Sequence, residues 1–197
     1  MVSAIVRPNW PFGEMRPLSY DFIMADPPWE FDTWSKAGKK HKSPENHYET
    51  MPPAEIAAAF PVGHLAGKDC VLWLWGTHPM VDQQIEVARS WGFAFVTSGV
   101  WVKRTVNGKL AFGTGYRLRC ASEPFIIATN GKPRTGKSVR TVIEGPLREH
   151  SRKPDEAYIE AERMMPRARR ADLFSRQSRP GWDSWGREAG KFDAVSS

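Results

Sequence analysis

Residues 20–29 read Tyr-Asp-Phe-Ile-Met-Ala-Asp-Pro-Pro-Trp, an apolar run that stops on one acid, two prolines and a tryptophan. The run over 20–25 predicts a buried strand, and the prolines end it because proline cannot donate a hydrogen bond to a central ladder. A strand that leaves the core through a proline-rich turn explains the prolines. It does not explain why the carboxylate of Asp26 stands at the end of that strand with the large aromatic Trp29 behind it.

Further apolar runs alternate with helical patterns along the chain. We predict strands over 70–75, 93–102, 124–128 and 170–174, and helices that begin at Pro52-Pro53, Pro79 and Pro154. Strands that alternate with helices predict an α/β fold, a mainly parallel sheet with helices on both faces. Ligands bind such sheets at the carboxyl ends of strands, so we expect one crevice beside Asp26, Gly76-Thr77 and Ser175-Arg176.

Composition fits one soluble domain over residues 1–197, with 41% hydrophobic and 25% charged residues. Within it we expect an N-terminal extension over 1–19, a basic active-site loop over 31–47 and a flexible tail over 189–197. No run approaches the roughly 20 apolar residues that span a bilayer, and no secretory signal is evident. The only cysteines, Cys70 and Cys120, have no metal-binding spacing and predict no disulfide framework. We therefore expect a cytoplasmic protein without a metal or membrane partner.

Positive charge is concentrated in the middle of the chain. Residues 101–153 carry 12 basic and 3 acidic side chains, whereas residues 1–100 carry 8 basic and 11 acidic ones. Such a surplus predicts a surface that faces a polyanion, although a solvated basic face would have the same composition. The candidate phosphate contacts are Arg117 and Arg119 in the stretch 103–120, and Lys39, Lys40 and Lys42 in the earlier loop.

Residues 131–138, Gly-Lys-Pro-Arg-Thr-Gly-Lys-Ser, match the phosphate-loop pattern G-x-x-x-x-G-K-[ST] letter for letter. A phosphate loop requires a helix that begins at its last residues. The residues that follow are β-branched and are interrupted by Gly145-Pro146, so we interpret the match as a coincidence and the segment as a basic loop.

The residues Asp26, Pro27, Pro28 and Trp29 suit a reaction on an aromatic amine such as the exocyclic nitrogen of adenine. The lone pair of that nitrogen is delocalised into the ring, and two acceptors on its N–H bonds would draw the nitrogen toward tetrahedral geometry. The carboxylate of Asp26 and the carbonyl of Pro27 supply such acceptors, and proline makes the carbonyl direction rigid. Trp29 can stack on the base or enclose it.

The tetrapeptide resembles the [DNS]PP[YFW] motif of amino-methyltransferases that use S-adenosylmethionine. The chain as a whole is similar to the messenger-RNA adenosine N6-methyltransferase (MT-A70) family, in a compact form of bacterial or phage type. The resemblance covers roughly residues 20–188 and implies a Rossmann-like methyltransferase fold in permuted motif order. It rests on the ordered motifs HYETM (47–51), VLWLWGT (71–77), WGF (91–93) with VWVK (100–103), HSRKPDEAY (150–158) and DLFSR (172–176).

The same resemblance implies the roles of individual residues. Asp26 would hold the target amine near the methionine end of the cofactor, and Tyr48 would pack on the target adenosine, although it suits an ordinary loop aromatic as well. Lys153 would lie near the cofactor carboxylate, although Lys153-Pro154 alone would mark only a helix start. Asp172 and Arg176 would lie at the ribose, whereas a salt bridge to Arg170 or Arg176 would equally explain Asp172.

Some positions depart from the family pattern. Arg179 stands where the family commonly has asparagine, and Gly186-Arg187-Glu188 stands where it has Gly-Asn-Gln. We retain Arg179, Arg187 and Glu188 as candidate cofactor contacts. The adenine and ribose contacts that the family makes at these positions are either rebuilt with these residues or lost.

The implied activity is transfer of a methyl group from S-adenosylmethionine to adenine N6 in nucleic acid. We favour DNA because the chain is a minimal domain without an RNA-binding module. RNA adenosine and a catalytically silent nucleic-acid-binding subunit remain alternatives, and a homodimer or a partner subunit is compatible with the sequence.

Overall fold

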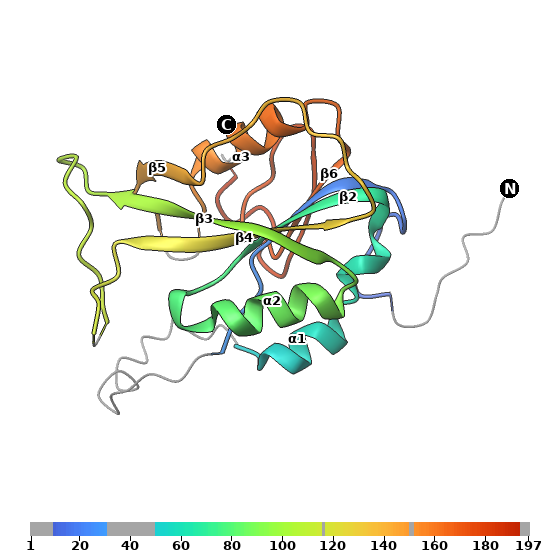
Figure 1. Cartoon of the computed structure of the whole chain (residues 1–197), viewed down its shortest axis with the longest axis horizontal. Helices are drawn as coiled ribbons and strands as arrows, with labels where there is room; N and C mark the ends of the chain where they lie inside the picture. The colour runs from blue at the N-terminus through green and yellow to red at the C-terminus, as the bar shows by residue number, and fades with distance from the viewer. Residues whose placement is uncertain (1–9, 31–49, 116, 150–151, 194–197) are drawn as a thin grey trace, which may run out of the picture.

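The computed structural model describes residues 10–30, 50–115, 117–149 and 152–193. One seven-stranded sheet runs through it, with helices on both faces (Figure 1). The strands are β1 (Tyr20–Ala25), β2 (Ala66–Trp75), β3 (Ala94–Arg104), β4 (Ser122–Asn130), β5 (Val142–Pro146), β6 (Arg170–Leu173) and β7 (Trp182–Trp185). The helices are α1 (Pro53–Ala59), α2 (Val81–Ser90) and α3 (Asp155–Met164), with short 3-10 turns η3 (Val62–His64) and η4 (His78–Met80).

The strand order β5-β3-β4-β2-β1-β6-β7 makes β1 a central strand. Its neighbours β2 and β6 are both parallel to it, and Met24 pairs with Trp73 on one side and with Asp172 on the other. Only β4 runs in the opposite direction, because it is antiparallel to both β2 and β3. The predicted mainly parallel α/β sheet is therefore confirmed, with one antiparallel strand inserted in it.

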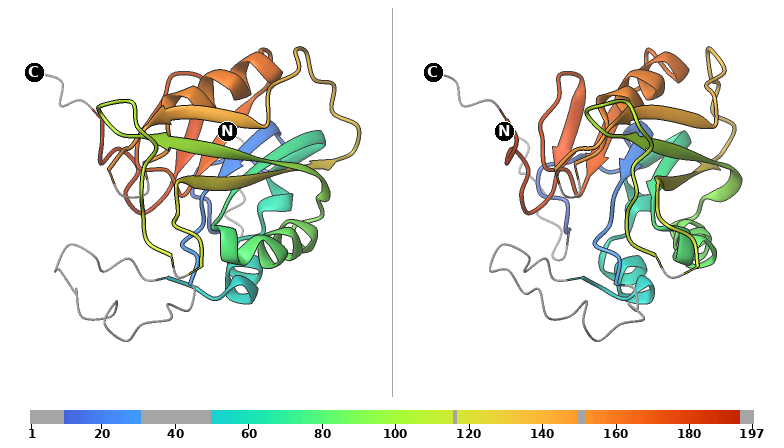
Figure 2. Two further views of the ribbon diagram at one scale, coloured as in Figure 1. Left: turned by 60° about the vertical axis from the view of Figure 1, so that its left-hand side comes forward. Right: turned by 90° about the vertical axis from the view of Figure 1, so that its left-hand side faces the viewer.

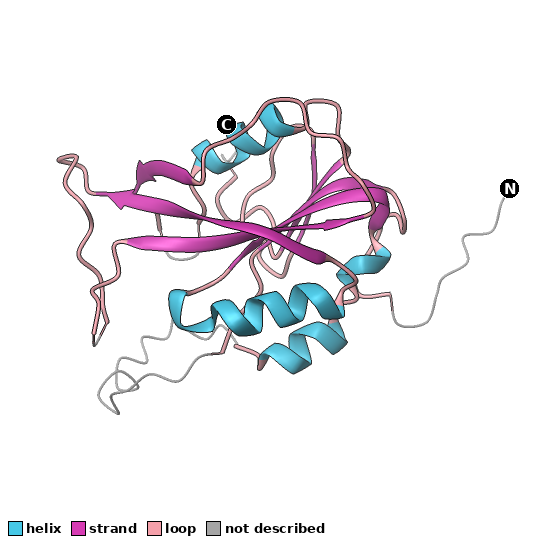
Figure 3. Ribbon diagram, in the orientation of Figure 1, coloured by secondary structure: helices cyan, strands magenta, loops and turns pink. Residues whose placement is uncertain are grey.

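Successive side chains of a strand point to opposite faces of the sheet, so the core forms two layers, one on each face. Ile23, Leu72 and Leu74 face α1 and α2, which lie together on one side of the sheet (Figure 3). Trp73 and Phe125 face the opposite side, where α3 lies, and they stack there with ring centroids 4.0 Å apart. Since both faces are covered, β1 is apolar at consecutive positions over 22–25 and β2 over 70–75, as expected for strands buried on both sides.

The predicted strands and helices are confirmed, with β2 and β4 longer than the apolar runs that predicted them. The sequence also suggested that residues 170–174 form the final strand, but β7 follows them, and neither β7 nor β5 was anticipated. Residues 131–138, which match the phosphate-loop pattern, lie in a loop, as expected. This loop, 131–141, leads directly into β5 rather than into a helix. In the part of the chain that the structure describes, no helix is long and apolar enough to cross a membrane.

One segment outside the sheet packs closely against it, and another extends away from it. Phe12, from the predicted N-terminal extension, is fully buried and packs edge-on against Trp10 and Trp185. The β3–β4 loop instead projects well beyond the sheet, as the views of Figure 2 also show. It leaves from the edge of the sheet at which β1 ends, because β3 has the same direction as β1.

Candidate active site

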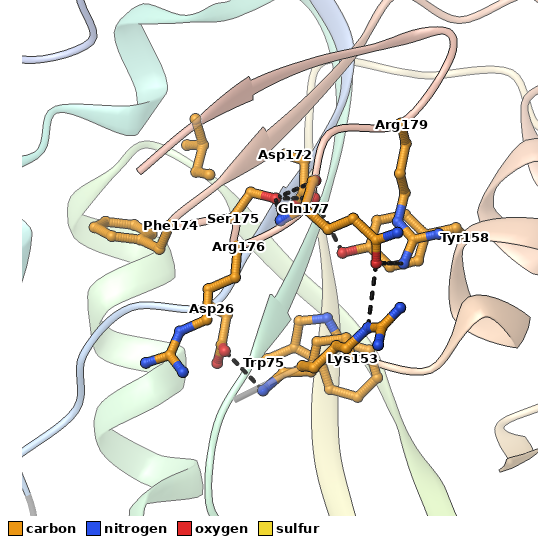
Figure 4. A pocket seen from close by; sticks show the side chains of 12 residues that line it. Asp26, Trp75, Lys153, Tyr158, Asp172, Phe174, Ser175, Arg176, Gln177 and Arg179 are labelled. Atoms are coloured by element: carbon orange, nitrogen blue, oxygen red, sulfur yellow. Dashed lines mark hydrogen bonds and ion pairs between the residues drawn. The ribbon is translucent and has the colours of Figure 1, made fainter. Parts of the chain in front are cut away.

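A cleft opens at the carboxyl ends of β1, β2 and β6, where parallel sheets bind ligands. It contains about 340 Å3 of free space, including solvent at its mouth. Figure 4 shows two groups of side chains in it: Asp26 with Lys153 beside Trp75, and Asp172 with Ser175 and Tyr158. The lining residues are Asp26, Trp75, Arg152, Lys153, Tyr158, Asp172, Leu173, Phe174, Ser175, Arg176, Gln177 and Arg179.

The first group is a chain of alternating charges. Lys153 Nζ lies 2.7 Å from Asp26 Oδ2 and 2.5 Å from Glu123 Oε1, and the Lys153 side chain is only 8% exposed. Glu123 Oε2 lies 2.7 Å from Lys103 Nζ, which is nearer the surface. Lys153 therefore neutralises two buried carboxylates at once, which fixes the position of each.

These contacts shift the ionisation of the three groups. Burial raises the pKa of Asp26 above its ordinary value, against the opposing effect of Lys153. Burial has the same tendency at Glu123, but there Lys153 and Lys103 prevail and lower the pKa. Burial opposes the charge of Lys153, yet the two carboxylates outweigh it and raise the pKa of the ammonium. Lys153 is thus held in its charged form.

The turn that carries Asp26 is fixed by hydrogen bonds. Trp29 donates its backbone N–H to the Pro27 carbonyl at 2.8 Å, a compact turn across Pro28. The Pro28 carbonyl accepts a bond from Met51 N–H at 2.8 Å. The indole of Trp29 is 6% exposed, and its Nε1 donates to the Trp75 carbonyl at 2.9 Å. Trp29 therefore ties the Asp-Pro-Pro-Trp turn to the end of β2.

The second group surrounds a buried carboxylate at the end of β6. Asp172 is 3% exposed, and its Oδ2 lies 3.0 Å from the Tyr158 hydroxyl and 2.8 Å from Ser175 Oγ. Burial raises the pKa of Asp172 to about 6, although both hydroxyls act to lower it. Near neutral pH Asp172 is thus an acceptor with lone pairs on the cleft side of its strand.

Three arginines also line the cleft. The Arg179 guanidinium lies 3.8 Å from the centre of the Tyr158 ring, and its Nη2 lies 2.7 Å from Asp155 Oδ1 at the start of α3. Arg176 Nε pairs with Glu188 Oε2 at 3.2 Å. Arg152 Nε donates to Gln177 Oε1 at 3.2 Å. The cleft therefore combines acids, cations and aromatic rings.

The backbone after β6 is strained where it borders the cleft. Phe174 has a φ of 62°, which is unusual for a residue with a side chain. Ser175 N–H donates to the Trp185 carbonyl at 3.0 Å, and the Phe174 ring packs edge-on against Phe60 and Trp185. Gly186 passes so close that a Cβ there would lie 2.6 Å from the Ser175 carbonyl oxygen, which explains why this position is glycine.

The structure brings several of the predicted site residues together. Asp26, Lys153, Asp172, Arg176 and Arg179 line the cleft, and Glu188 reaches it through its pair with Arg176.

Three others lie farther out. Arg117 and Arg119 are exposed on the β3–β4 loop, where Arg119 stacks 4.7 Å from the Phe112 ring, and Arg187 is exposed beside Glu188. Lys39, Lys40, Lys42 and Tyr48, with the predicted loop 31–47, lie outside the described residues.

Sequence reasoning missed Glu123, which contacts Lys153 as closely as Asp26 does. Glu123 begins β4, and the beginning of an antiparallel strand meets the same edge of the sheet as the ends of its parallel neighbours. Two signals were available, an acid directly before Pro124 and a basic partner at Lys103. Tyr158 and Gln177 were missed as well, since each became a site residue only through folding.

The similarity of the chain to known proteins agrees with this arrangement. It is 28% identical to the type II methyltransferase M.MunI of a Mycoplasma species, over 90% of this chain and 81% of that protein. It is 32% identical to the N(6)-adenosine-methyltransferase MT-A70-like protein of Arabidopsis thaliana over 86% of this chain, and 28% identical to the human N(6)-adenine-specific methyltransferase METTL4 over 92% of it. The chain spans only 24% and 41% of these two proteins. The MT-A70 family model matches residues 20–188, and the chain belongs to the MT-A70 family.

Proposed function

We propose that this protein transfers a methyl group from S-adenosylmethionine to the N6 amino group of adenine in nucleic acid. The observation that carries the proposal is the Asp26 carboxylate, held 2.7 Å from Lys153 at the end of a central strand and next to the rigid Pro27 carbonyl. A fixed acceptor pair of this kind suits an aromatic amine, whose two N–H bonds must both be accommodated. The family membership and the names of the relatives support the same reaction.

In the proposed mechanism Asp26 and Pro27 act on the amine in two ways. Their oxygens accept the two N6–H bonds, which orients the nitrogen lone pair and favours its pyramidal form. As the new N–CH3 bond forms, the bond between that methyl group and the sulfonium sulfur of the donor would break, and its electron pair would remain on sulfur as a neutral thioether. The nitrogen becomes positively charged and loses one proton. The Asp26 carboxylate accepts that proton, and its raised pKa makes it a better base than an exposed aspartate.

Lys153 and Trp29 are proposed as supports for this acceptor pair. Lys153 fixes the carboxylate of Asp26, and the indole of Trp29 fixes the turn through the Trp75 carbonyl. An ammonium group has three N–H donors, and Asp26 and Glu123 take two of them. The third donor suits the carboxylate of a bound amino-acid moiety.

The cleft fits S-adenosylmethionine chemically. The cofactor has a zwitterionic amino-acid end, a positively charged sulfur, a ribose diol and a flat base, and when bound it supplies the activated methyl group. Asp172 is a suitable acceptor for ribose hydroxyls, and Arg176 and Arg179 lie on the same loop. Among the described residues, the buried Trp75 Nε1 and Arg179 Nε have no hydrogen-bond partner although both side chains line the cleft, so each can donate to a ligand.

We favour DNA as the substrate over RNA. The similarity to the type II methyltransferase of a Mycoplasma species, 28% identical over 90% of this chain, supports this choice. The exposed Arg117 and Arg119 extend from the cleft edge of the sheet on the β3–β4 loop and suit phosphate contacts. In a duplex the target base would have to leave the stack to reach Asp26.

A catalytically silent nucleic-acid-binding subunit is the second candidate. Such a protein has no need to keep a carboxylate, a lysine and two prolines in one arrangement at the strand end. In this chain Asp26, Lys153 and the Asp-Pro-Pro-Trp turn are intact and mutually bonded. This arrangement favours the enzyme.

The experiment that tests the proposal compares the wild type with Asp26→Asn. Both proteins are incubated with methyl-labelled S-adenosylmethionine and adenine-containing DNA or RNA. The variant keeps the shape of the side chain but loses its charge, so we expect methyl transfer to fall by roughly 10²- to 10³-fold with an unchanged fold. Transfer at the wild-type rate would refute the role of Asp26, and cofactor binding by the wild type without any transfer would favour the silent subunit.

A further inference from the structure

The loop that borders the cleft after β6, residues 174–179, is called the cleft loop here. The last described residues of the chain pack against its outer side. We call residues 188–193 the C-terminal strap. Gly186, just before the strap, lies against the backbone of Phe174 and Ser175. The chain then makes three successive backbone turns, in which Ala189 donates to Gly186, Lys191 to Glu188, and Asp193 to Gly190. These turns return the strap to the cleft loop.

The strap contacts three cleft-loop groups through distinct bonds. Phe192 N–H donates to the Arg176 carbonyl at 3.0 Å, and Glu188 Oε2 lies 3.2 Å from Arg176 Nε. The Ser178 backbone N–H donates to Asp193 Oδ1 at 2.7 Å. Both the main chain and the side chain of Arg176 are therefore restrained, and Ser178 is restrained two residues later.

The strap also reaches the opposite wall of the cleft. The Arg152 guanidinium lies 5.2 Å from the centre of the Phe192 ring, and Arg152 Nε donates to Gln177 Oε1. Arg152 directly precedes Lys153, the partner of Asp26. Phe192 thus lies between the loop after β6 and the segment that leads into α3, and it contacts both.

A restraint is needed here because the cleft loop is not part of any helix or strand. It begins with Phe174 in a left-handed conformation, which persists only where the surroundings enforce it. Ordering a loop at the moment of binding lowers affinity, whereas a loop that is ordered beforehand avoids that entropic cost.

We infer that Phe192 and Asp193 are positioning residues, which hold the loop 174–179 in the conformation that receives the cofactor. The inference rests on the proposed function, since it requires that S-adenosylmethionine binds in this cleft. Its consequence is specific: loss of the strap contacts weakens cofactor binding without altering the methyl-transfer step, because Asp26 and Pro27 belong to another strand end.

The test is isothermal titration calorimetry of the full chain with S-adenosylmethionine, for the wild type and four variants. Phe192→Ala removes the ring that lies against the Arg152 guanidinium, and we expect the cofactor Kd to rise. Asp193→Ala removes the acceptor of Ser178 N–H, and we expect the cofactor Kd to rise about 3- to 10-fold. Asp193→Asn retains a side-chain oxygen that can accept that bond, so we expect a Kd within twofold of wild type. Asp82→Ala, an exposed acid in the first turn of α2, serves as the matched control and leaves Kd unchanged.

Kinetics add a second readout. For Asp193→Ala we expect the KM for the cofactor to rise in proportion to Kd, while kcat at saturating cofactor stays within twofold of wild type. An unchanged Kd in both Asp193→Ala and Phe192→Ala would overturn the inference. A wild type that binds no S-adenosylmethionine would instead overturn the proposed function, so the two failures are distinguishable.

Discussion

Replacing Lys153 by methionine tests how much the charged chain at the cleft contributes to the fold. Lys153 is 8% exposed and is the shared partner of Asp26 and Glu123, whose side chains are 21% and 18% exposed. Methionine has a similar length and no charge, so it preserves packing and leaves two largely buried carboxylates without their common cation. Glu123 retains its pair with Lys103, whereas Asp26 loses the cation that lies 2.7 Å from its carboxylate.

The expected loss follows from these contacts. Removing one partner of a buried ion pair costs about 3–5 kcal/mol, because the other charge remains buried and uncompensated. In the wild type the pKa of Lys153 is raised, so the contribution of this lysine to the free energy of unfolding is constant below the pKa of an unfolded lysine and is lost only at higher pH. Without Lys153 the folded-state pKa of Asp26, already raised in the wild type, rises further, and that of Glu123 rises as well, so the stability of the variant falls as the pH rises through the range of these carboxylate pKa values. We expect a loss of about 3–5 kcal/mol at pH 8 and roughly half of it at pH 5.

The assay is urea unfolding of the wild type and variant at both pH values, followed by tryptophan fluorescence. Lys103→Met is the control, because that lysine is more exposed and its loss leaves Lys153 in place; we expect a loss of about 1 kcal/mol or less. Adding Glu123→Gln to Lys153→Met should recover part of the stability. A loss below about 1 kcal/mol that is equal at both pH values would refute the reasoning.

Three further predictions concern the second carboxylate, the strand-end backbone and the basic loop. Because the folded-state pKa of Asp172, about 6, exceeds its unfolded value, the wild type loses stability as the pH rises from about 4 to 6, and Asp172→Asn does not. The stability of this variant relative to wild type should rise by about 2 kcal/mol between pH 4 and 7, and a difference independent of pH would contradict the prediction. Gly186→Ala places a Cβ 2.6 Å from the Ser175 carbonyl oxygen and should lower the free energy of unfolding by about 1–3 kcal/mol in a urea titration; a neutral effect would show that the contact relaxes freely. Replacing Arg117 and Arg119 together by serine should reduce the slope of log K against log salt for DNA binding by about 2, whereas an unaltered slope would place both outside the interface.

The central strand and its motif could be predicted because their signals are local. Residues 22–25 are apolar without interruption, and Pro27-Pro28 cannot continue a central strand, so the position of Asp26 at a strand end was readable from the sequence. The helix beginning at Pro154 was readable for a similar reason. The two missed strands lack such signals. β5 includes Gly145 and Pro146, and β7 reads Trp-Asp-Ser-Trp with two polar residues at its centre.

The missing site residues depended on tertiary structure. Glu123 reaches Lys153 only because β4 runs against its neighbours, and strand direction is not encoded in an apolar run. The orientation of the Trp29 side chain could not be predicted either, because an indole after two prolines can point toward a substrate or into the core. In the structure it lies in the core and bonds to the Trp75 carbonyl. Phe12 likewise became a core residue only through contacts with Trp185, far away in the sequence.

The most direct test of the central claim identifies the nucleoside that receives the methyl group. The pure protein is incubated with methyl-labelled S-adenosylmethionine and, separately, duplex DNA, single-stranded DNA, structured RNA and unstructured RNA. Each product is digested to nucleosides and separated. We expect label in N6-methyldeoxyadenosine with the wild type and none with Asp26→Asn. Label only at positions other than adenine N6, or equal label with the variant, would contradict the central claim. Label in N6-methyladenosine alone would show that the same reaction takes place on RNA rather than on DNA.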